Sequence, residues 1–525
     1  MDTNKLKNIF LCFGLLILSL CLRLPTFQIP LLDVDEAQFA GYANALLSGG
    51  IPFIDSVDTK TPAIYCFYAI IFAIFGKNNM AAVHVITAFW IGCTAFIISK
   101  ITNIISNTKT AVIAGIIYVA FSNCYTPAFA STSIASIMAL PLSLNIYFLL
   151  KWEIQKKNLH LFLSGVAFGI ACIFKYQAGI NLFVIVIYFL LFFKESVKYL
   201  LIFFYGALSV AAIFLFFLFS SGAWREAWFY TFYGNIAYIA KNNSKHFIFE
   251  YSFTKLLAFI YSTAGFWILG TFETALSIKE HLCGDSIKNR HEILIILWCL
   301  LSFVAVSIGN RFYGHYFYQI LPPLSILAAL AVKRFSRWIQ NKSLQRLKYP
   351  ALALLFLTLF YNLPKAIFNR YNIDNYYKNS TSDYPQLYIP IAEYIKTHTP
   401  ENEKIFVWGF ATPIYFFSNR DSASRFLWCD WLTGRIAGAM YNDSPLFEKA
   451  KHIAIHSWEL LFEDLAKNRP LYIIDTSYGG YHTYKKLGIK HYSNLWKYLQ
   501  THYVFETRVN GADIYKRNDT LTHPM

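Results

Sequence analysis

Charged residues are scarce in this sequence. Only 14% of the 525 residues are charged, whereas 56% are hydrophobic and 18% are aromatic. Soluble domains carry roughly a quarter charged residues. The composition therefore argues against an ordinary soluble protein and indicates that most of the chain faces lipid.

Cysteine motifs and basic clusters are missing as well. The nine cysteines form no CxxC pair and have no recurrent spacing, and several lie inside apolar runs, which argues against a disulfide framework or a zinc site. The net charge of +16 comes from basic residues dispersed between apolar runs, with no basic stripe that would suit a nucleic acid. Loop charges that orient a membrane protein explain this excess better.

Long apolar runs make up the first two thirds of the chain. A membrane-spanning helix needs ~20 predominantly apolar residues. The first run follows Lys5 and Lys7 and lacks a small-residue cleavage site, which predicts a retained anchor rather than a signal peptide. The fold class is therefore predicted as a polytopic α-helical membrane protein with about eleven spans, at roughly 8–25, 80–101, 109–125, 131–150, 159–175, 178–193, 199–220, 254–276, 292–309, 317–333 and 349–365.

The orientation follows from the loop charges. With the N-terminus inside, the basic residues concentrate in the internal loops, for example at 151–157 and 333–348. The first loop, 26–79, then lies outside. Within it, the segments 37–47 and 62–76 are apolar but short, and they suit helices in the membrane interface.

The composition changes after about residue 366, where charged residues return. We predict strands at Lys404–Trp408, Leu471–Asp475, His502–Thr507 and Ala512–Lys516, and helices near 386–398 and 444–468. The predicted domains are thus a membrane domain, 1–365, which includes the external loop 26–79, and an extracytoplasmic α/β domain, 366–525.

The pair Asp35-Glu36 in the first loop has two interpretations. Asp35 with Gln38 three residues later resembles a helix capping box, and Asp33 is an alternative cap. The other interpretation is a general base that removes a proton from an acceptor hydroxyl. One carboxylate of the pair is enough for that role, because neighbouring helical positions point ~100° apart.

Cationic residues recur at the external ends of the apolar runs. Lys60 follows the acidic pair, Lys175 ends one run, and Arg311 and His315 belong to the stretch Gly309–Tyr316. Each of them alone suits an interfacial anchor. Together, on one membrane face, they suit the binding of a phosphate.

These motifs resemble a known family in their order. Asp35-Glu36, Asp58-x-Lys60-x-Pro62-x-x-Tyr65 and His315-Tyr316-x-x-Gln319-x-Leu321-Pro322-Pro323 are similar to motifs of the C-class (GT-C) membrane glycosyltransferases. Within this class the chain resembles bacterial relatives of the dolichyl-phosphate-mannose protein mannosyltransferases and the lipid A aminoarabinose transferase. Relatives often have Lys-Pro-Pro where this chain has Lys60-Thr61-Pro62, which leaves the lysine in place.

The resemblance implies an inverting transfer of one sugar from a polyprenyl phosphate to an extracytoplasmic acceptor, at the plasma (inner) membrane of a bacterium. Its acceptor would be a lipid such as lipid A, a glycan or a protein. Asp35 is then the predicted base, assisted by Glu36, and the predicted donor-phosphate ligands are Lys60, Lys175, Arg311, His315 and Tyr316. No metal or other cofactor is required in this scheme, although Asp33, Asp35 and Glu36 are candidates to recruit a divalent cation.

Two alternatives remain open at this point. A transporter or flippase of lipid-linked glycans would share the many spans, but the sequence has no clear duplicated half. A polymerase or ligase that uses a diphosphate-linked glycan would share the architecture. It would need more cationic or metal-binding groups than the sequence offers.

Overall fold

The computed structural model describes residues 3–123, 130–236, 252–283, 290–339, 385–435 and 456–519. The chain divides into two compact units. The first contains Met1–Leu32, Met80–Phe217 and Asn242–Tyr376, and the second contains Asp33–Asn79, Leu218–Lys241 and Tyr377–Met525. The first loop and the C-terminal region therefore belong to the same unit, although most of the first unit lies between them in the sequence.

The first unit is built from apolar helices. Its elements are α1 (Thr3–Arg23), η1 (Leu24–Gln28), α4 (Met80–Ile105), α5 (Thr108–Phe121), α6 (Ile134–Gln155), α7 (Asn158–Phe174), η2 (Tyr176–Ile180), α8 (Asn181–Phe192), most of α9 (Ser196–Ser220), α12 (Phe253–Ser262), α13 (Ala264–Cys283), α14 (Arg290–Ser307), η5 (Gly314–Gln319) and α15 (Leu321–Ile339).

Helices occupy all the predicted spans that fall on described residues, and the span predicted at 349–365 lies outside them. Five described helices are long and apolar enough to cross a membrane, or six if one bent pair counts as a single span. The other apolar helices, such as α5, α7 and α8, are shorter. The structure therefore supports a membrane protein with several spans, and the number eleven stays a prediction.

The predicted span 254–276 is not one straight helix. It consists of α12 and α13, which meet at 89° around Thr263. The Thr263 hydroxyl donates to the carbonyl of Phe259 at 2.6 Å. A threonine that bonds back to the preceding turn competes with the helical backbone pattern and favours a bend.

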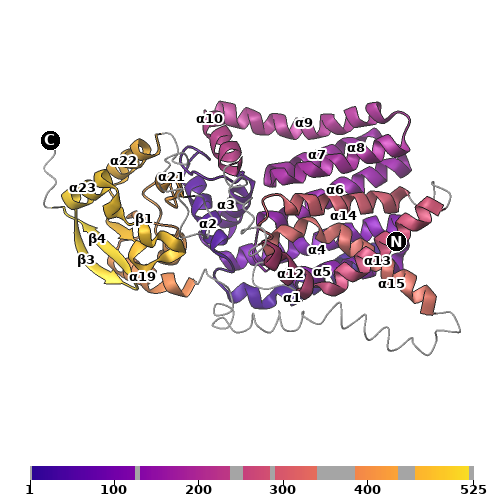
Figure 1. Ribbon diagram of the computed structural model, residues 1–525, viewed down its shortest axis with the longest axis horizontal. Coiled ribbons are helices and arrows are strands. Elements are labelled where there is room, and N and C mark those ends of the chain that lie inside the picture. The colour runs from indigo at the N-terminus through magenta and orange to yellow at the C-terminus, as the bar shows by residue number, and fades with distance from the viewer. Residues whose placement is uncertain are drawn as a thin grey trace. The chain divides into compact units, whose positions relative to one another are not determined.

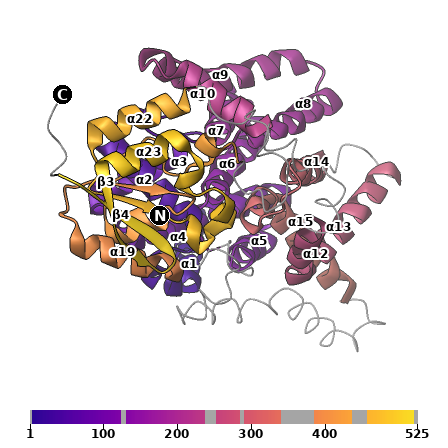
Figure 2. The same cartoon turned by 60° about the vertical axis from the view of Figure 1, so that its left-hand side comes forward.

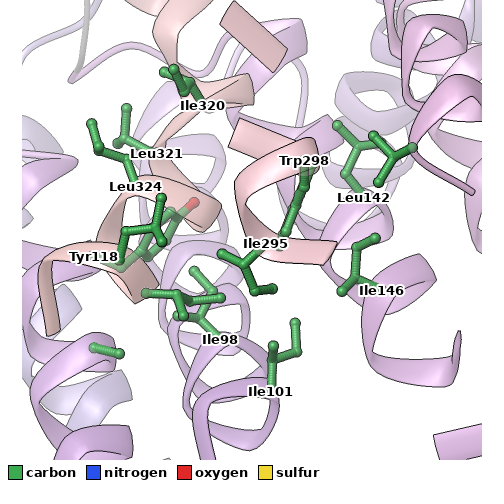
Figure 3. Packing of buried hydrophobic residues seen from close by; sticks show 14 of the residues in the cluster. Ile98, Ile101, Tyr118, Leu142, Ile146, Ile295, Trp298, Ile320, Leu321 and Leu324 are labelled. Atoms are coloured by element: carbon green, nitrogen blue, oxygen red, sulfur yellow. The ribbon is translucent and has the colours of Figure 1, made fainter. Parts of the chain in front are cut away.

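The core of the first unit lies where these helices meet. Figure 3 shows side chains from several helices converging, among them Ile98 of α4, Leu142 of α6, Ile295 of α14 and Leu324 of α15. All four are at most 2% exposed. Their packing holds together chain segments that are far apart in the sequence.

The second unit has a small mixed sheet formed by its C-terminal part (Figure 1). The strands are β1 (Ile405–Trp408), β2 (Tyr472–Asp475), β3 (Tyr503–Val509) and β4 (Ala512–Arg517), in the order β1-β2-β4-β3. β1 pairs with β2 in parallel, and the other two pairs are antiparallel. All four predicted strands are thus present. The fully buried residues of β1 and β2 explain their continuous apolar runs.

Helices accompany the sheet, as the turned view in Figure 2 also shows. Both predicted helical stretches contain helices, α19 (Pro385–His398) and α22 (Ser457–Asn468), while residues 444–455 lie outside the described part. The other C-terminal elements are α20 (Pro413–Ser418), α21 (Asp430–Thr433), η9 (Ser477–Gly479), η10 (Tyr481–Lys486), η11 (Ile489–His491) and α23 (Ser493–His502).

The first loop contributes two helices to the second unit. They are α2 (Val34–Leu47) and α3 (Ala63–Phe75), and they pack against each other. The segment after α9 adds α10 (Trp224–Trp228) and η3 (Phe229–Tyr233). Helices were predicted at 37–47 and 62–76, so these two predictions are confirmed as secondary structure.

Candidate active site

The first turn of α2 presents the acidic pair. Asp33 is the N-cap: its backbone is extended, and its side chain accepts a hydrogen bond from the backbone amide of Asp35 at 3.1 Å. The interpretation of Asp35 as the cap is therefore wrong, and the alternative cap, Asp33, is the one observed. Capping by Asp33 leaves the Asp35 carboxylate available for other contacts.

Asp35 and Glu36 lie in different environments. The Asp35 side chain is 31% exposed, whereas Glu36 is completely buried. Consecutive helical residues point in different directions, so one of the two faces the protein interior. Of the pair, only Asp35 is accessible to an acceptor molecule without a rearrangement of the protein.

Lys60 lies beside Asp35. Its Nζ donates to Asp35 Oδ1 at 3.4 Å and to Gln38 Oε1 at 2.8 Å. The ammonium group has three N–H donors, so these two contacts leave one N–H for a ligand. A carboxylate and a cation predicted to share one site are thus in direct contact.

Asp58 orients Gln38, and sequence reasoning assigned it no role. Its carboxylate accepts from Gln38 Nε2 at 2.8 Å, from the backbone amide of Thr59 at 2.6 Å and from the Tyr65 hydroxyl. Because Nε2 of Gln38 is turned to Asp58, Oε1 is turned to Lys60. The signal in the sequence was the spacing Asp58-x-Lys60, which places both groups on one short turn.

Burial and charge act in opposite directions on these groups. Burial raises the pKa of Asp58, and the neighbouring Lys60 and Tyr65 offset this only in part. Burial also acts to lower the pKa of Lys60, but the charges of Asp35 and Asp58 outweigh it, and the pKa lies above its usual value. Lys60 is therefore a cation at neutral pH.

The other predicted phosphate ligands lie in the first unit. Lys175 follows α7, and its Nζ lies 3.8 Å from the centre of the Tyr316 ring. His315 lies edge-on to the same ring, with 4.9 Å between the ring centres. Arg311 is completely buried just before η5. The structure thus brings Lys175, His315 and Tyr316 together in one unit, and Asp35, Glu36 and Lys60 in the other.

Arg23 is a buried cation that sequence reasoning missed. It ends α1 and is completely buried. Its guanidinium donates to the carbonyl of Ala130 and to the Tyr318 hydroxyl, the latter at 3.5 Å. From the sequence, an arginine at the end of an apolar run is interpreted as an interfacial anchor. Its burial becomes visible only in the folded structure.

The acidic pair is a poor site for a divalent cation as it stands. Asp33 is engaged as a helix cap, Glu36 is buried, and the positive charge of Lys60 lies 3.4 Å from Asp35. Within the described part of the chain, no three His, Cys, Asp or Glu side chains form a group that could hold a metal ion. A cation here would have to displace Lys60 against electrostatic repulsion.

Comparison with known proteins shows which structures this fold resembles. The family model of dolichyl-phosphate-mannose-protein mannosyltransferases matches residues 59–219. The structure is similar to that of ArnT from Cupriavidus metallidurans bound to undecaprenyl phosphate, with a TM-score of 0.61, 13% identity and coverage of 100% of both chains. The chain has the GT-C fold. No curated protein sequence matches it significantly.

Two further structures extend the likeness within the GT-C fold. One is the oligosaccharyltransferase of Archaeoglobus fulgidus tethered with an acceptor peptide, with a TM-score of 0.56, 12% identity and coverage of 98% of this chain and 74% of the other. The second is AglB of the same organism with an inhibitory peptide and a dolichol-phosphate, with a TM-score of 0.55, 13% identity and coverage of 99% and 75%. The predicted resemblance is therefore confirmed for the fold.

Proposed function

We propose that this protein is an inverting glycosyltransferase that moves one sugar from a polyprenyl phosphate, such as undecaprenyl phosphate, to an acceptor outside the cytoplasm. The observation that carries the proposal is the contact between Asp35 and Lys60, a partly exposed carboxylate 3.4 Å from an ammonium group. A base for the acceptor and a cation for the leaving group are the two functions that such a transfer needs.

The reaction follows from the chemistry of these two groups. The acceptor hydroxyl gives its proton to the Asp35 carboxylate while its oxygen forms a bond to the anomeric carbon. The bond between that carbon and the phosphate oxygen breaks, and the phosphate leaves with the electron pair. Attack on the face opposite the leaving group inverts the anomeric configuration.

Lys60 stabilises the charge that develops on the phosphate. Its third N–H is directed to the leaving oxygen in this proposal, while Asp35 and Gln38 hold the other two. A hydrogen-bond donor that is already in place before the reaction stabilises the transition state, because it does not have to move during the reaction. Lys175, Arg311, His315 and Tyr316 remain predicted donor ligands, which substitution of each residue tests.

A second candidate is the transfer of a longer glycan, as the likeness to an oligosaccharyltransferase suggests. The match to ArnT spans both chains completely, whereas this chain spans 74% of the oligosaccharyltransferase. The extents of the matches therefore favour a transferase of the ArnT type.

Mass spectrometry of the cell envelope tests the proposal. Lipids, glycans and proteins are compared between cells with the protein, cells without it, and cells with Asp35→Asn. The proposal predicts one monosaccharide modification that disappears in the last two. A change in the distribution of lipid-linked glycans across the membrane, with no lost modification, would support the transporter alternative instead.

A further inference from the structure

The C-terminal region contributes an aromatic ring to the Lys60 site. Lys60 Nζ lies 5.0 Å from the centre of the Phe39 ring and 5.4 Å from that of Trp428. Phe39 belongs to α2, and Trp428 lies between β1 and β2 in the sequence. A cation within ~6 Å of a ring centre is attracted by the ring face, and Trp attracts it most strongly.

Neighbouring rings hold Trp428 in place. Phe410 stacks on it, with 5.0 Å between ring centres and 17° between ring planes, and Tyr42 of α2 meets it edge-on at 6.5 Å. Trp428 is 3% exposed and Phe39 is 1% exposed. Two buried rings therefore contact the ammonium group of a lysine whose side chain is 24% exposed.

The backbone before Trp428 is tied to the loop that carries Lys60. The amide of Val57 donates to the carbonyl of Arg425 at 3.1 Å. The Arg425 guanidinium is in turn bound to both oxygens of Asp464 in α22, at 2.8 and 3.0 Å. These bonds fix the distance between two segments that are remote in the sequence.

We propose that Trp428 is a positioning residue for donor binding, which holds the Lys60 ammonium group in place to receive the donor phosphate. This inference rests on the proposed function of Lys60. It gives the C-terminal region a direct part in donor recognition. The ring face also shields one side of the ammonium from water, so that the open side is left for the phosphate.

The alternative is that Trp428 only stabilises the fold. Trp408 provides the control, because it is a buried tryptophan of the same region with a structural setting. Its ring packs on Trp458 and Tyr492, and its indole N–H donates to the carbonyl of Leu487 at 2.7 Å. Trp408→Phe is expected to lower the melting temperature without changing donor affinity.

Binding of undecaprenyl phosphate to the full-length protein in lipid nanodiscs tests the inference. Trp428→Leu should weaken binding by about two- to thirty-fold, the range expected for one cation–π contact. Trp428→Phe should lose less, since it keeps a ring face. The double variant Lys60→Ala/Trp428→Leu should bind no more weakly than Lys60→Ala, because Trp428 acts through Lys60.

Each outcome has one meaning. Wild-type binding by a folded Trp428→Leu variant overturns the inference, as does an additive loss in the double variant. Equal binding by wild type and Lys60→Ala overturns both the inference and the phosphate role of Lys60. If binding follows the expected pattern but no sugar is transferred, then the proposed function fails while the positioning role stands.

Discussion

The ammonium group of Lys60 lies 3.4 Å from the carboxylate of Asp35. The two residues are 25 positions apart, on a loop and on the first turn of α2, and Gln38 and Asp58 fix their contact. In the proposed reaction the carboxylate of this pair accepts a proton, and the ammonium group stabilises the leaving phosphate.

Removal of the Lys60 charge should affect the donor more than the acceptor. Hydrogen bonds to a charged group contribute roughly 1.5–3 kcal/mol, so Lys60→Ala should lower kcat/KM for the donor about ten- to a hundred-fold. Lys77→Ala is the matched control, because Lys77 forms an exposed ion pair with Asp421 in the same unit. Kinetics at varied donor and then varied acceptor check this, and a defect confined to the acceptor would contradict it.

Asp58→Asn should disturb Lys60 through Gln38. Both carboxylate oxygens of Asp58 accept hydrogen bonds, from Thr59 on one side and from Gln38 and Tyr65 on the other. The side-chain amide of Asn has one acceptor oxygen, so its NH2 group would face the N–H or O–H donor that Asp58 now accepts. The lost hydrogen bond should lower the unfolding free energy by about 1–3 kcal/mol. Asp55→Asn is the control, since Asp55 is exposed and its carboxylate accepts a local hydrogen bond from the backbone amide of Ile51.

Denaturation and donor kinetics together check the role of Asp58. We expect Asp58→Asn to lower both the stability of the protein and its kcat/KM for the sugar donor. Asp55→Asn should leave kcat/KM for the sugar donor unchanged. A stable Asp58→Asn variant with normal donor kinetics would show that Gln38 needs no orientation by Asp58.

Some of this site followed from the sequence. The acidic pair, Lys60 and the helices around them could be predicted, because apolar periodicity and scarce charges are local signals. The choice of Asp33 over Asp35 as the cap could not, since both have suitable cap chemistry. Trp428 and Arg23 were also beyond prediction, because their roles depend on contacts between segments more than 100 residues apart.

Chelation of divalent cations should leave transfer intact. The positive charge beside Asp35 is already supplied by Lys60, and a monophosphate leaving group is stabilised by cationic side chains in the proposed reaction. Purified protein treated with EDTA and then dialysed should retain its rate. A loss that added Mg²⁺ or Mn²⁺ restores would contradict this and would reassign the acidic pair as metal ligands.

The orientation of the C-terminal region can be tested with an introduced thiol. Cys429 is unsuitable because it is completely buried and burial raises its pKa. Thr501→Cys is exposed at the end of α23, and Lys157→Cys is exposed in a loop predicted to be internal. With the exposed Cys21 and Cys66 changed to Ser, an impermeant maleimide should label residue 501 in intact cells, and residue 157 only after lysis. The reverse pattern would overturn the predicted topology.

The most direct measurement of the central claim is sugar transfer by purified Asp35→Asn protein in lipid nanodiscs, with the polyprenyl-phosphate donor and acceptor identified from the envelope comparison. Asn keeps the size of Asp35, and the cap of α2 is Asp33, so the variant should fold normally. We predict that transfer falls by at least ~100-fold, the lower range for a general base, while Glu36→Gln, at a completely buried position, loses less. Near-wild-type turnover by Asp35→Asn would contradict the account.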